Sequence, residues 1–439
     1  MEVFLKVTVV GAGLAGSEAA LQLARSGIRV DLCEMRPGTM TPAHTTGLPA
    51  ELVCSNSLRS NLLHNAPGLL KEELRMCESF LMKAADSCRV PAGGALAVDR
   101  EEFSRTVREM LLDHELITMK EEEVNDIPSG EVIIAAGPLA SKPLTDAIVE
   151  LTGSGSLYFY DAIAPVIDFE SINMDRAFFQ NRYEKGGDAD YLNCPLSEEE
   201  YFDFVRELKS AERVSPRDFE KEIHFQGCMP VEAIADSGDM SLAFGAMKPV
   251  GLLNPLTGQR PFAVVQLRME NRAGTAWNLV GFQTKLTYPE QKRIFRMIPG
   301  LEKAEFIRLG SMHRNTFING PSLLGGRMRL KTDERIMFAG QITGIEGYIE
   351  SIASGYLAGK LMAGLQTLPP ADTALGAILR YTSETATDNY QPSNINYGLF
   401  PPMADKIRGG RRARREAQAE RALMSLGKWL VSLSAVSFQ

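Results

Sequence analysis

The order of hydrophobic and polar residues predicts a strand–helix–strand unit near the start of the chain. An apolar run rich in β-branched residues, Val7 to Val10, ends at a glycine. A segment of helical character, Ser17 to Arg25, follows, and a second apolar run covers Ile28 to Cys33. Short apolar runs of this composition are typical of buried strands. The pattern therefore predicts a βαβ unit.

The remaining pattern divides the chain into three parts. Helical periodicity at 69–85 and 99–112 and an apolar strand at 131–138 complete the first part, which we place at residues 1–160. Residues 161–300 are of mixed character, with a helix at 196–212 and alternating strands at 262–270 and 277–285. A strand, a glycine-rich turn and a long helix return at 335–364. We therefore predict that the first domain resumes at residues 301–439, ends in a basic C-terminal helix, and is interrupted by an insertion domain.

Glycines after the first predicted strand have the spacing GxGxxG. In a dinucleotide site Gly11 permits a tight turn, Gly13 lets the backbone approach a pyrophosphate, and Gly16 lets helix and strand pack closely. The helix N-terminus offers free N–H groups to the anion. Glu34, eighteen residues past Gly16, is placed to accept hydrogen bonds from ribose hydroxyls. We expect the cofactor to contact the whole turn and this acid: Gly11, Ala12, Gly13, Leu14, Ala15, Gly16 and Glu34.

The late glycine-rich unit favours FAD over NAD. FAD is extended and needs backbone amides at both ends, whereas NAD needs one βαβ unit. We expect Gly340, Gln341 and Gly344 to hold the second end. The predicted fold class is α/β, with a Rossmann-like FAD-binding domain of the glutathione-reductase type, interrupted by a smaller mixed α/β insertion domain.

Composition is that of an ordinary globular protein, with 44% hydrophobic and 23% charged residues in a chain of 439. The six cysteines contain no CxxC pair, which argues against a disulfide framework or a zinc site and fits a reducing cytoplasm. The five histidines are dispersed and do not have the spacing of a metal-binding motif, so we expect no metal. The start of the chain has no features of a signal peptide, and no window reaches the length of a membrane span. We therefore expect a cytoplasmic protein with no membrane partner.

Charge is distributed unevenly. The formal net charge of −8 at pH 7 counts mildly against a nucleic-acid partner. However, residues 285–335 carry eleven Lys or Arg against five Asp or Glu, and residues 406–421 carry seven against two. Recognition of an RNA backbone needs such local excess. For the C-terminal run, a solvated helix face is an equally open interpretation.

Two cysteines are candidates for reactive thiols. Cys54 lies among small polar residues, and the nearby Arg59 would stabilise a thiolate. Cys228 lies between a glycine and a Met–Pro pair, in a segment that is neither regular helix nor central strand, with His224 close in sequence. A structural role is open for each, because free cysteine usually behaves as a small buried hydrophobic residue.

Several sequence words extend almost from end to end of the chain: GAGLAGSEAA, EMRP, AELVCSNSLRSN, RVPAGGALAVDRE, FGAMKPVGL, MHRNTFINGP and FAGQITGIEGYIES. On these words the chain resembles the folate- and FAD-dependent tRNA uracil-5-methyltransferases. That family makes ribothymidine in the T-loop of tRNA with methylenetetrahydrofolate. The resemblance implies tRNA, bound through its T-arm, as the partner.

The resemblance also implies roles for the candidate residues. Cys228 would add to C6 of uracil, since C5 is a poor nucleophile until a thiolate does so. Cys54 would stand by the flavin, as the base that removes the C5 proton or as a guard of the flavin. His313 would stack on the folate pterin, although a core histidine is the alternative. The flavin would take reducing equivalents from NADPH or NADH, and its N5 would pass the methylene of 5,10-methylenetetrahydrofolate to the uracil.

Cationic residues are the candidates for contacts to RNA. Arg314, beside the predicted pterin residue, would meet either a folate carboxylate or an RNA phosphate. Lys248 would contact phosphate or lie solvated at the surface. Arg411 and Arg412 belong to the C-terminal basic run, but the tail after Pro402 matches none of the family words. The target base would have to turn out of its stack to reach the flavin.

Three other functions are open at this point. The first is the related flavoprotein that modifies the wobble uridine of tRNA, although that enzyme is typically longer. The second is the same chemistry on a ribosomal RNA uridine. The third is a flavin-dependent oxidoreductase of small molecules or a non-catalytic FAD-binding module, against which the two cysteines and the basic excess speak.

Overall fold

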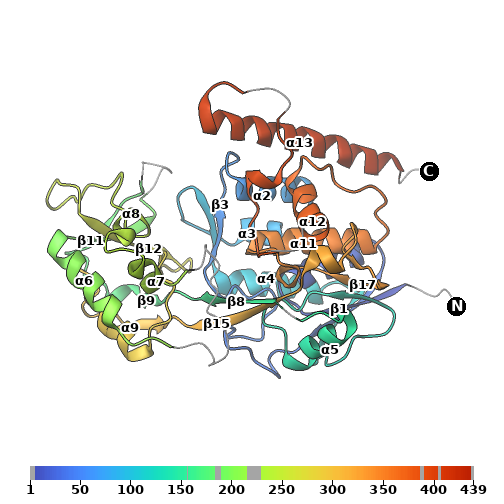
Figure 1. The fold of residues 1–439 in the computed structure, drawn as a ribbon, viewed down its shortest axis with the longest axis horizontal. Helices are drawn as coiled ribbons and strands as arrows, with labels where there is room; N and C mark the ends of the chain where they lie inside the picture. Colours follow the sequence, from blue (N-terminus) through green and yellow to red (C-terminus); the bar gives the residue numbers. More distant parts are fainter. Residues whose placement is uncertain are drawn as a thin grey trace.

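The computed structural model of the protein describes residues 5–155, 157–182, 189–214, 229–385, 390–403 and 407–436. Two lobes lie side by side, and each has its own hydrophobic core (Figure 1). The core of the larger lobe draws on residues before Gly137 and after Met328. The core of the smaller lobe draws on residues between Ile167 and Ala304. The smaller lobe is therefore inserted into the larger one.

A six-stranded sheet forms the centre of the larger lobe. Its spatial order is β16 (Arg329–Leu330), β17 (Asp333–Phe338), β7 (Glu131–Ile134), β1 (Lys6–Val10), β2 (Arg29–Glu34) and β6 (Ile117–Glu121). Neighbours run parallel except for β16 and β17. The side chains of Val7 and Val9 in β1 are fully buried, as expected for a parallel sheet that is covered on both faces. The chain order thus reverses at β1, with β2 on one side and β7 on the other.

Helices of the larger lobe cover this sheet and extend the core: α1 (Leu14–Arg25), α2 (Ala66–Met76), α3 (Phe80–Ser87), α4 (Arg100–Leu112), α5 (Lys142–Thr152), α11 (Tyr348–Met362), α12 (Ala374–Glu384) and α13 (Gly410–Val436). Helices α1 and α11 make the closest contact, because a side chain at Gly355 would overlap the backbone of Ala15. A Cβ at Gly340 would lie 2.8 Å from the Cβ of Ala15. The early and late glycine turns are therefore neighbours in space.

The smaller lobe is built on an antiparallel sheet of order β10 (Phe178–Phe179), β11 (Tyr191–Leu196), β12 (Ala263–Met269), β13 (Ala276–Leu279), β9 (Val166–Asp168) and β14 (Phe306–Arg308). Its helices are α6 (Glu198–Ser210), α7 (Val231–Asp236), α8 (Ser241–Phe244) and α9 (Tyr288–Phe295). The N-terminus of α6 has a full capping box between Ser197 and Glu200. Since β14 ends at Arg308, the sheet of this lobe extends past residue 300, where we placed the domain boundary.

Two strands, β8 (Leu157–Ala162) and β15 (Met312–Phe317), pair antiparallel where the chain passes between the lobes (Figure 1). In this pair His313 lies opposite Asp161, and Asn315 opposite residue 159. Side chains alternate along a strand, so His313 and Asn315 share one face of the ribbon. Directly opposite residues also share a face, which brings Asp161 to the same side.

Two predicted elements differ in extent, and one sheet was not predicted. The helix expected at 69–85 is two helices, α2 and α3, because Glu78 has a φ of 55° and Ser79 caps the second one through its Oγ. The strand expected at 277–285 ends after β13, and Gly281 turns the chain with a φ of 78°. A small sheet of β3 (Ser57–Ser60), β5 (Ala95–Val98) and β4 (Arg89–Val90) was not predicted. Among the helices that the structure describes, none is long and apolar enough to cross a membrane.

Candidate functional site

A cavity of about 410 Å³ opens where the carboxyl ends of β1, β2 and β7 meet the strands that link the lobes. Volumes of this size are typical of small-molecule and cofactor sites. Its position at the reversal of strand order is the usual ligand position in a parallel α/β sheet. Several predicted cofactor residues line it: Gly11, Gly13, Leu14, Ala15, Glu34, Gly340 and Gln341. Ala12, Gly16 and Gly344 are not among the lining residues.

The early glycine turn is shaped by backbone requirements. Gly11 has a φ of 96°, and a Cβ there would lie 2.7 Å from the carbonyl oxygen of Ala135. A Cβ at Gly16 would overlap the carbonyl oxygen of Gly11, so the helix can pack on the turn only with glycine at this position. By contrast, a Cβ at Gly13 would meet nothing within 4 Å. The turn is thus tightly packed from behind and open toward the cavity at Gly13.

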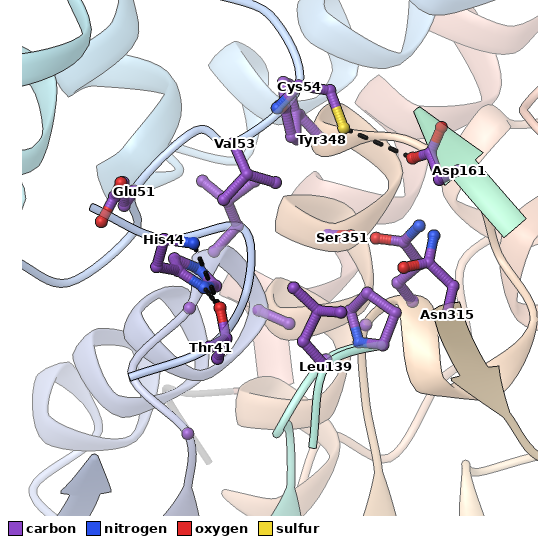
Figure 2. A pocket seen from close by; sticks show the side chains of 18 of the residues that line it. Thr41, His44, Glu51, Val53, Cys54, Leu139, Asp161, Asn315, Tyr348 and Ser351 are labelled. Carbon is purple, nitrogen blue, oxygen red and sulfur yellow. Dashed lines mark hydrogen bonds between the residues drawn. The ribbon is translucent and has the colours of Figure 1, made fainter. Parts of the chain in front are cut away.

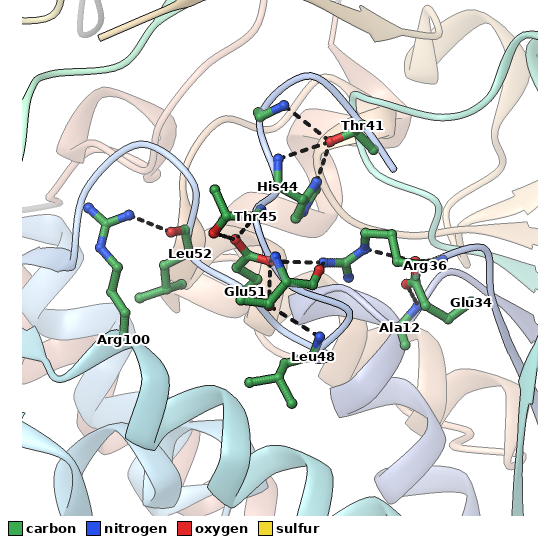
Figure 3. A network of polar contacts seen from close by, with 12 residues as sticks. Ala12, Glu34, Arg36, Thr41, His44, Thr45, Leu48, Glu51, Leu52 and Arg100 are labelled. Carbon is green, nitrogen blue, oxygen red and sulfur yellow. Dashed lines mark hydrogen bonds and ion pairs between the residues drawn. The ribbon is translucent and has the colours of Figure 1, made fainter. Parts of the chain in front are cut away.

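Glu34 anchors the loop that follows β2, as Figure 3 shows. Its Oε2 accepts a hydrogen bond from the Ala12 N–H at 2.9 Å, and its Oε1 accepts one from Arg36 Nε at 2.9 Å. Arg36 also pairs with Glu51 at 3.2 Å, and Glu51 accepts from the N–H and hydroxyl of Thr46. Burial alone would raise the pKa of Glu34, but the hydrogen bonds and charge of Arg36 outweigh it and hold that pKa below its ordinary value. The carboxylate therefore stays ionised at the cavity wall.

The late glycine turn forms a part of the wall that adjoins the early turn. Gly340 has a φ of 81°, and the next residue, Gln341, donates from Nε2 to Glu346 Oε2 at 2.6 Å. Burial raises the pKa of Glu346 well above its ordinary value. Gly344, with a φ of 88°, packs against the ring of Tyr390 and not against the cavity. The turn thus presents a backbone edge and the Gln341 amide to the cavity.

Cys54 lines the cavity, and its thiol points toward Asp161 (Figure 2). The Sγ donates to Asp161 Oδ2 at 3.3 Å, and the Cys54 N–H donates to the Tyr348 hydroxyl at 2.7 Å. Burial, and then the negative charge of Asp161, raise the pKa of this thiol well above its ordinary value. Arg59, which we expected to stabilise a thiolate, pairs with the buried Glu350 instead. In this arrangement Cys54 is a protonated thiol beside a carboxylate.

The loop before Cys54 is fixed by two arginines from different parts of the chain. Arg100 Nη1 donates to the carbonyl oxygen of Leu52 at 2.6 Å, and Arg308 Nη1 donates to that of Val53 at 3.3 Å. Arg100 also pairs with Glu270 of the smaller lobe at 2.5 Å. Burial, and then the charge of Arg100, lower the pKa of Arg308 to about 10. Both lobes therefore position the thiol.

His313 is buried beside the same carboxylate. Its Nε2 lies 3.9 Å from Asp161 Oδ2, and its Nδ1 has no hydrogen-bond partner among the residues that the structure describes. Burial lowers the pKa of His313, so the imidazole is neutral near pH 7. The ligand atoms of Cys54, Asp161 and His313 lie within 4.8 Å of one another and could together hold a thiophilic divalent ion. The expectation of no metal stays a prediction.

Sequence reasoning missed Asp161 and Asn315. Asp161 is the one charged residue in the apolar stretch LYFYDAIAP, which is a signal that it serves a special purpose. Asn315 follows two residues after His313 on β15 and also lines the cavity, near Asp161 in Figure 2. Its position on the same strand face was not readable from the sequence, because the pairing of β8 with β15 was not predicted.

Of the remaining candidates, Arg314 and Lys248 are not among the residues that line the cavity. Cys228, with His224, lies outside the residues that the structure describes. Arg314 stacks its guanidinium 4.4 Å over the ring of Tyr158, on the strand position next to His313. Lys248 lies partly exposed in the smaller lobe, shortly after α8.

Arg411 and Arg412 are exposed at the start of α13, which runs along the top of the molecule in Figure 1. Part of the predicted basic excess between residues 285 and 335 is neutralised by partly exposed ion pairs with acids from outside that segment. Arg293 pairs with Glu207 at 2.5 Å, and Arg329 pairs with Glu131 at 2.9 Å. That segment is therefore less cationic at the surface than its sequence suggests.

The wall residues fit an FAD. The open Gly13 and the α1 N-terminus suit a pyrophosphate, and Glu34 Oε2, with a single bond so far, has capacity for a ribose hydroxyl. The adjacent Gly340 turn supplies the second contact region. These features and Cys54 line the same cavity.

Comparison with known proteins agrees with this geometry. Residues 6–367 match the family described as Glucose inhibited division protein A. Methylenetetrahydrofolate–tRNA-(uracil-5-)-methyltransferase TrmFO of Syntrophotalea carbinolica is 57% identical over 429 residues, which cover 96% of this chain and 93% of the relative. The TrmFO of Geobacter sulfurreducens is 57% identical over 433 residues, or 97% of this chain and 99% of the relative.

Solved structures of GidA from Aquifex aeolicus share the fold. The form II crystal structure superposes with a TM-score of 0.69 at 17% sequence identity, over 97% of this chain and 73% of that one. At such low identity the likeness concerns the fold alone. The fold is that of the GidA-like FAD-binding flavoproteins, so the predicted α/β class is confirmed.

Proposed function

We propose that this protein, which belongs to the Glucose inhibited division protein A family and to its TrmFO members, methylates C5 of a tRNA uridine. The specific target we propose is the T-loop uridine, U54, which becomes ribothymidine. The one-carbon group would come from 5,10-methylenetetrahydrofolate, with reducing equivalents from NADPH or NADH. Support comes from relatives named methylenetetrahydrofolate–tRNA-(uracil-5-)-methyltransferase that match almost the whole chain at 54–57% identity.

The observation that carries the proposal is a single cavity that joins a dinucleotide cradle to a buried thiol. The walls at Gly13 and Gly340 would hold the FAD, and Glu34 would bind its ribose. When bound, the flavin supplies redox chemistry and the transfer of the one-carbon group. Arginines from both lobes fix the two residues that precede Cys54, and a small-molecule oxidoreductase would not need a thiol positioned in this way.

The residues around the thiol would hold its proton and fix its position. Asp161 accepts a hydrogen bond from Cys54. For Cys54 to act as the base at uracil C5, the thiol would first pass its own proton to Asp161, and the thiolate would then take the C5 proton. Tyr348 fixes the backbone of Cys54, so the sulfur has a defined position. The neutral imidazole of His313 would offer an uncharged face for the folate pterin. Cys228 would be the nucleophile that adds to uracil C6, as the family resemblance implies.

Contacts to RNA would come from cations outside the cavity. We assign this role to Lys248, Arg314, Arg411 and Arg412, which lie on both lobes and on α13. Because each phosphate contact releases counterions, RNA affinity should fall steeply as salt rises. A flat response to salt between low and physiological concentration would remove these residues from the proposal.

One incubation tests the function directly. The protein, unmodified tRNA, methylenetetrahydrofolate and NADPH are combined, and the nucleosides are then analysed. Ribothymidine in the T-loop is the expected result. The same product in ribosomal RNA but not in tRNA would instead establish the second candidate, which shares all the flavin-site features. No product in either RNA, from FAD-bound protein, would refute the proposal.

A second experiment tests the nucleophile. Cys228→Ala should retain FAD but form no covalent adduct with RNA that contains 5-fluorouracil. Cys194→Ala is the matched control, because Cys194 is buried in the core of the smaller lobe and should not affect adduct formation. An adduct that persists in Cys228→Ala would refute the assignment.

A further inference from the structure

The amide of Asn315 is buried without a partner at the wall of the cavity. Its side chain is 1% exposed, and neither Oδ1 nor Nδ2 has a hydrogen-bond partner among the residues that the structure describes. Asn315 lines the cavity, and Figure 2 shows it beside Asp161. Buried amides in folded proteins are almost always bonded, so an amide with both atoms unpaired requires an explanation.

Other buried asparagines of the same chain show the normal situation. Asn56 donates to the carbonyl oxygens of Val98 and Met269 at 3.0 and 2.8 Å and accepts from an arginine at 3.0 Å. Asn193 Nδ2 donates to three backbone carbonyls, and its Oδ1 accepts from Gln266 at 2.8 Å. Both are 0% exposed and lie outside the lining of the cavity. These two structural asparagines are thus bonded. Asn315 has both amide atoms unpaired among the described residues and Asn278 has its Nδ2 unpaired, and both of these residues line the cavity.

The strand holds Asn315 in place without using its side chain. β15 is paired with β8 through its backbone, and the burial along β15 alternates so that His313, Asn315 and Phe317 face inward. The amide therefore satisfies no backbone group of its own strand and caps no helix. It remains available for a ligand.

We propose that Asn315 binds the lactam edge, –NH–C(=O)–, of a planar heterocycle in the cavity. A primary amide presents one donor and one acceptor in a plane, which complements the acceptor and donor of a lactam. The inference rests on the proposed function, which brings three rings with such an edge to this cavity: the flavin, the pterin and the uracil. The shared edge is the recognised feature, and binding measurements identify the ring.

Asn315→Leu is the test, because leucine has a similar volume and no polar atoms. In the ligand-free protein this substitution removes two unpaired polar atoms, so thermal stability should be unchanged or higher. Asn193→Leu is the matched control, and it should lower thermal stability because it removes hydrogen bonds that Asn193 makes in the folded protein. If Asn315→Leu destabilises the ligand-free protein as much as Asn193→Leu does, Asn315 is structural and the inference is wrong.

Three binding measurements on Asn315→Leu complete the test, and none requires turnover. In the first, ligand-free protein is titrated with FAD, and in the second, FAD-loaded protein is titrated with tetrahydrofolate. In the third, the affinity for T-arm RNA with uridine at the target is compared with the affinity for the same RNA with 3-methyluridine there. Loss of two neutral hydrogen bonds should weaken one of these ligands by about 10- to 100-fold. For uracil, the variant should lose the discrimination against the blocked N3 edge.

A protein that binds FAD or folate through Asn315 but methylates no RNA would leave this inference intact and refute only the proposed function. All three affinities unchanged within about twofold would refute the inference.

Discussion

Removal of the Asp161 charge should make Cys54 more reactive. The Sγ and the nearest carboxylate oxygen are 3.3 Å apart, so an ionised thiol would place two negative charges in direct contact. Asp161→Asn keeps the shape of the side chain and its ability to accept the thiol hydrogen bond through the amide oxygen, but it removes the charge. A nearby like charge disfavours the ionised form of a group and so raises the pKa of an acid. The pKa of Cys54 should therefore fall in the variant.

The effect on alkylation follows from two opposing terms. Below the pKa, the thiolate fraction rises roughly tenfold for each unit by which the pKa falls, but a less basic thiolate is also a weaker nucleophile, with a Brønsted coefficient of about 0.4–0.5. The observed rate should therefore rise, by about 3- to 4-fold for each unit by which the pKa falls. Because burial is the largest cause of the raised pKa, Cys54 should still react more slowly than an exposed cysteine.

The assay is iodoacetamide labelling between about pH 7 and pH 9, with the Cys54 peptide followed by mass spectrometry. Cys194 is an internal control, because burial raises its pKa to about 12 and it should stay unlabelled unless the variant unfolds. An unchanged or slower rate at Cys54, with Cys194 still protected, would refute the argument that Asp161 keeps the thiol protonated.

Three further predictions concern the scaffold. Gly355→Ala should destabilise the protein by roughly 1–3 kcal/mol in urea unfolding, because the new methyl group overlaps the backbone of α1. The control is Gly427→Ala, at a helix position with room for a methyl group, which should be neutral or stabilising by up to about 1 kcal/mol. Arg36 lowers the pKa of Glu34 from 4.5, and the ionised Glu34 stabilises the fold only above its folded pKa. Arg36→Met should raise that pKa, so acid should release FAD at a higher pH, as measured by flavin fluorescence. Burial, and then the charge of Arg59, lower the pKa of Lys71 from 10.5 to about 7. Between these two pH values Lys71 is protonated in the unfolded chain and neutral in the folded protein, so folding becomes more favourable as the pH rises. The free energy of unfolding of the parent, relative to that of Lys71→Met, should therefore rise by up to about 1.4 kcal/mol per pH unit from about pH 8 to 10.

The cofactor cradle could be predicted from sequence because its requirements are local. Gly11 and Gly16 are fixed by backbone contacts within one βαβ unit, and a fixed spacing records them. Glu34 ends the second strand of the same unit, so its distance from the turn was implied by the strand and helix lengths. The Gly340 turn was harder to place, yet its strand–glycine–helix pattern repeated the first.

The groups around the thiol could not be predicted in the same way. Asp161 and His313 are 152 positions apart in the chain and meet only because β8 pairs with β15 in one register. Sequence reasoning instead gave Cys54 the nearest cation in the chain, Arg59, which the structure pairs with Glu350. Nearness in sequence was a poor guide here, because a buried glutamate from α11 provides the stronger partner for that cation.

The dependence on register explains why both lobes are needed for a working site. A shift of one residue between β8 and β15 would turn His313 and Asn315 away from the cavity and replace them with Arg314 and Thr316. A two-stranded ribbon has little stability of its own in water. The register is held instead at its ends, where β8 leads into β9 of the smaller sheet and β15 leads into α10 (Gly320–Leu323) of the larger lobe. The two lobes thus hold the ribbon at its opposite ends. The connection between the smaller and the larger lobe therefore determines which side chains of the ribbon face the cavity.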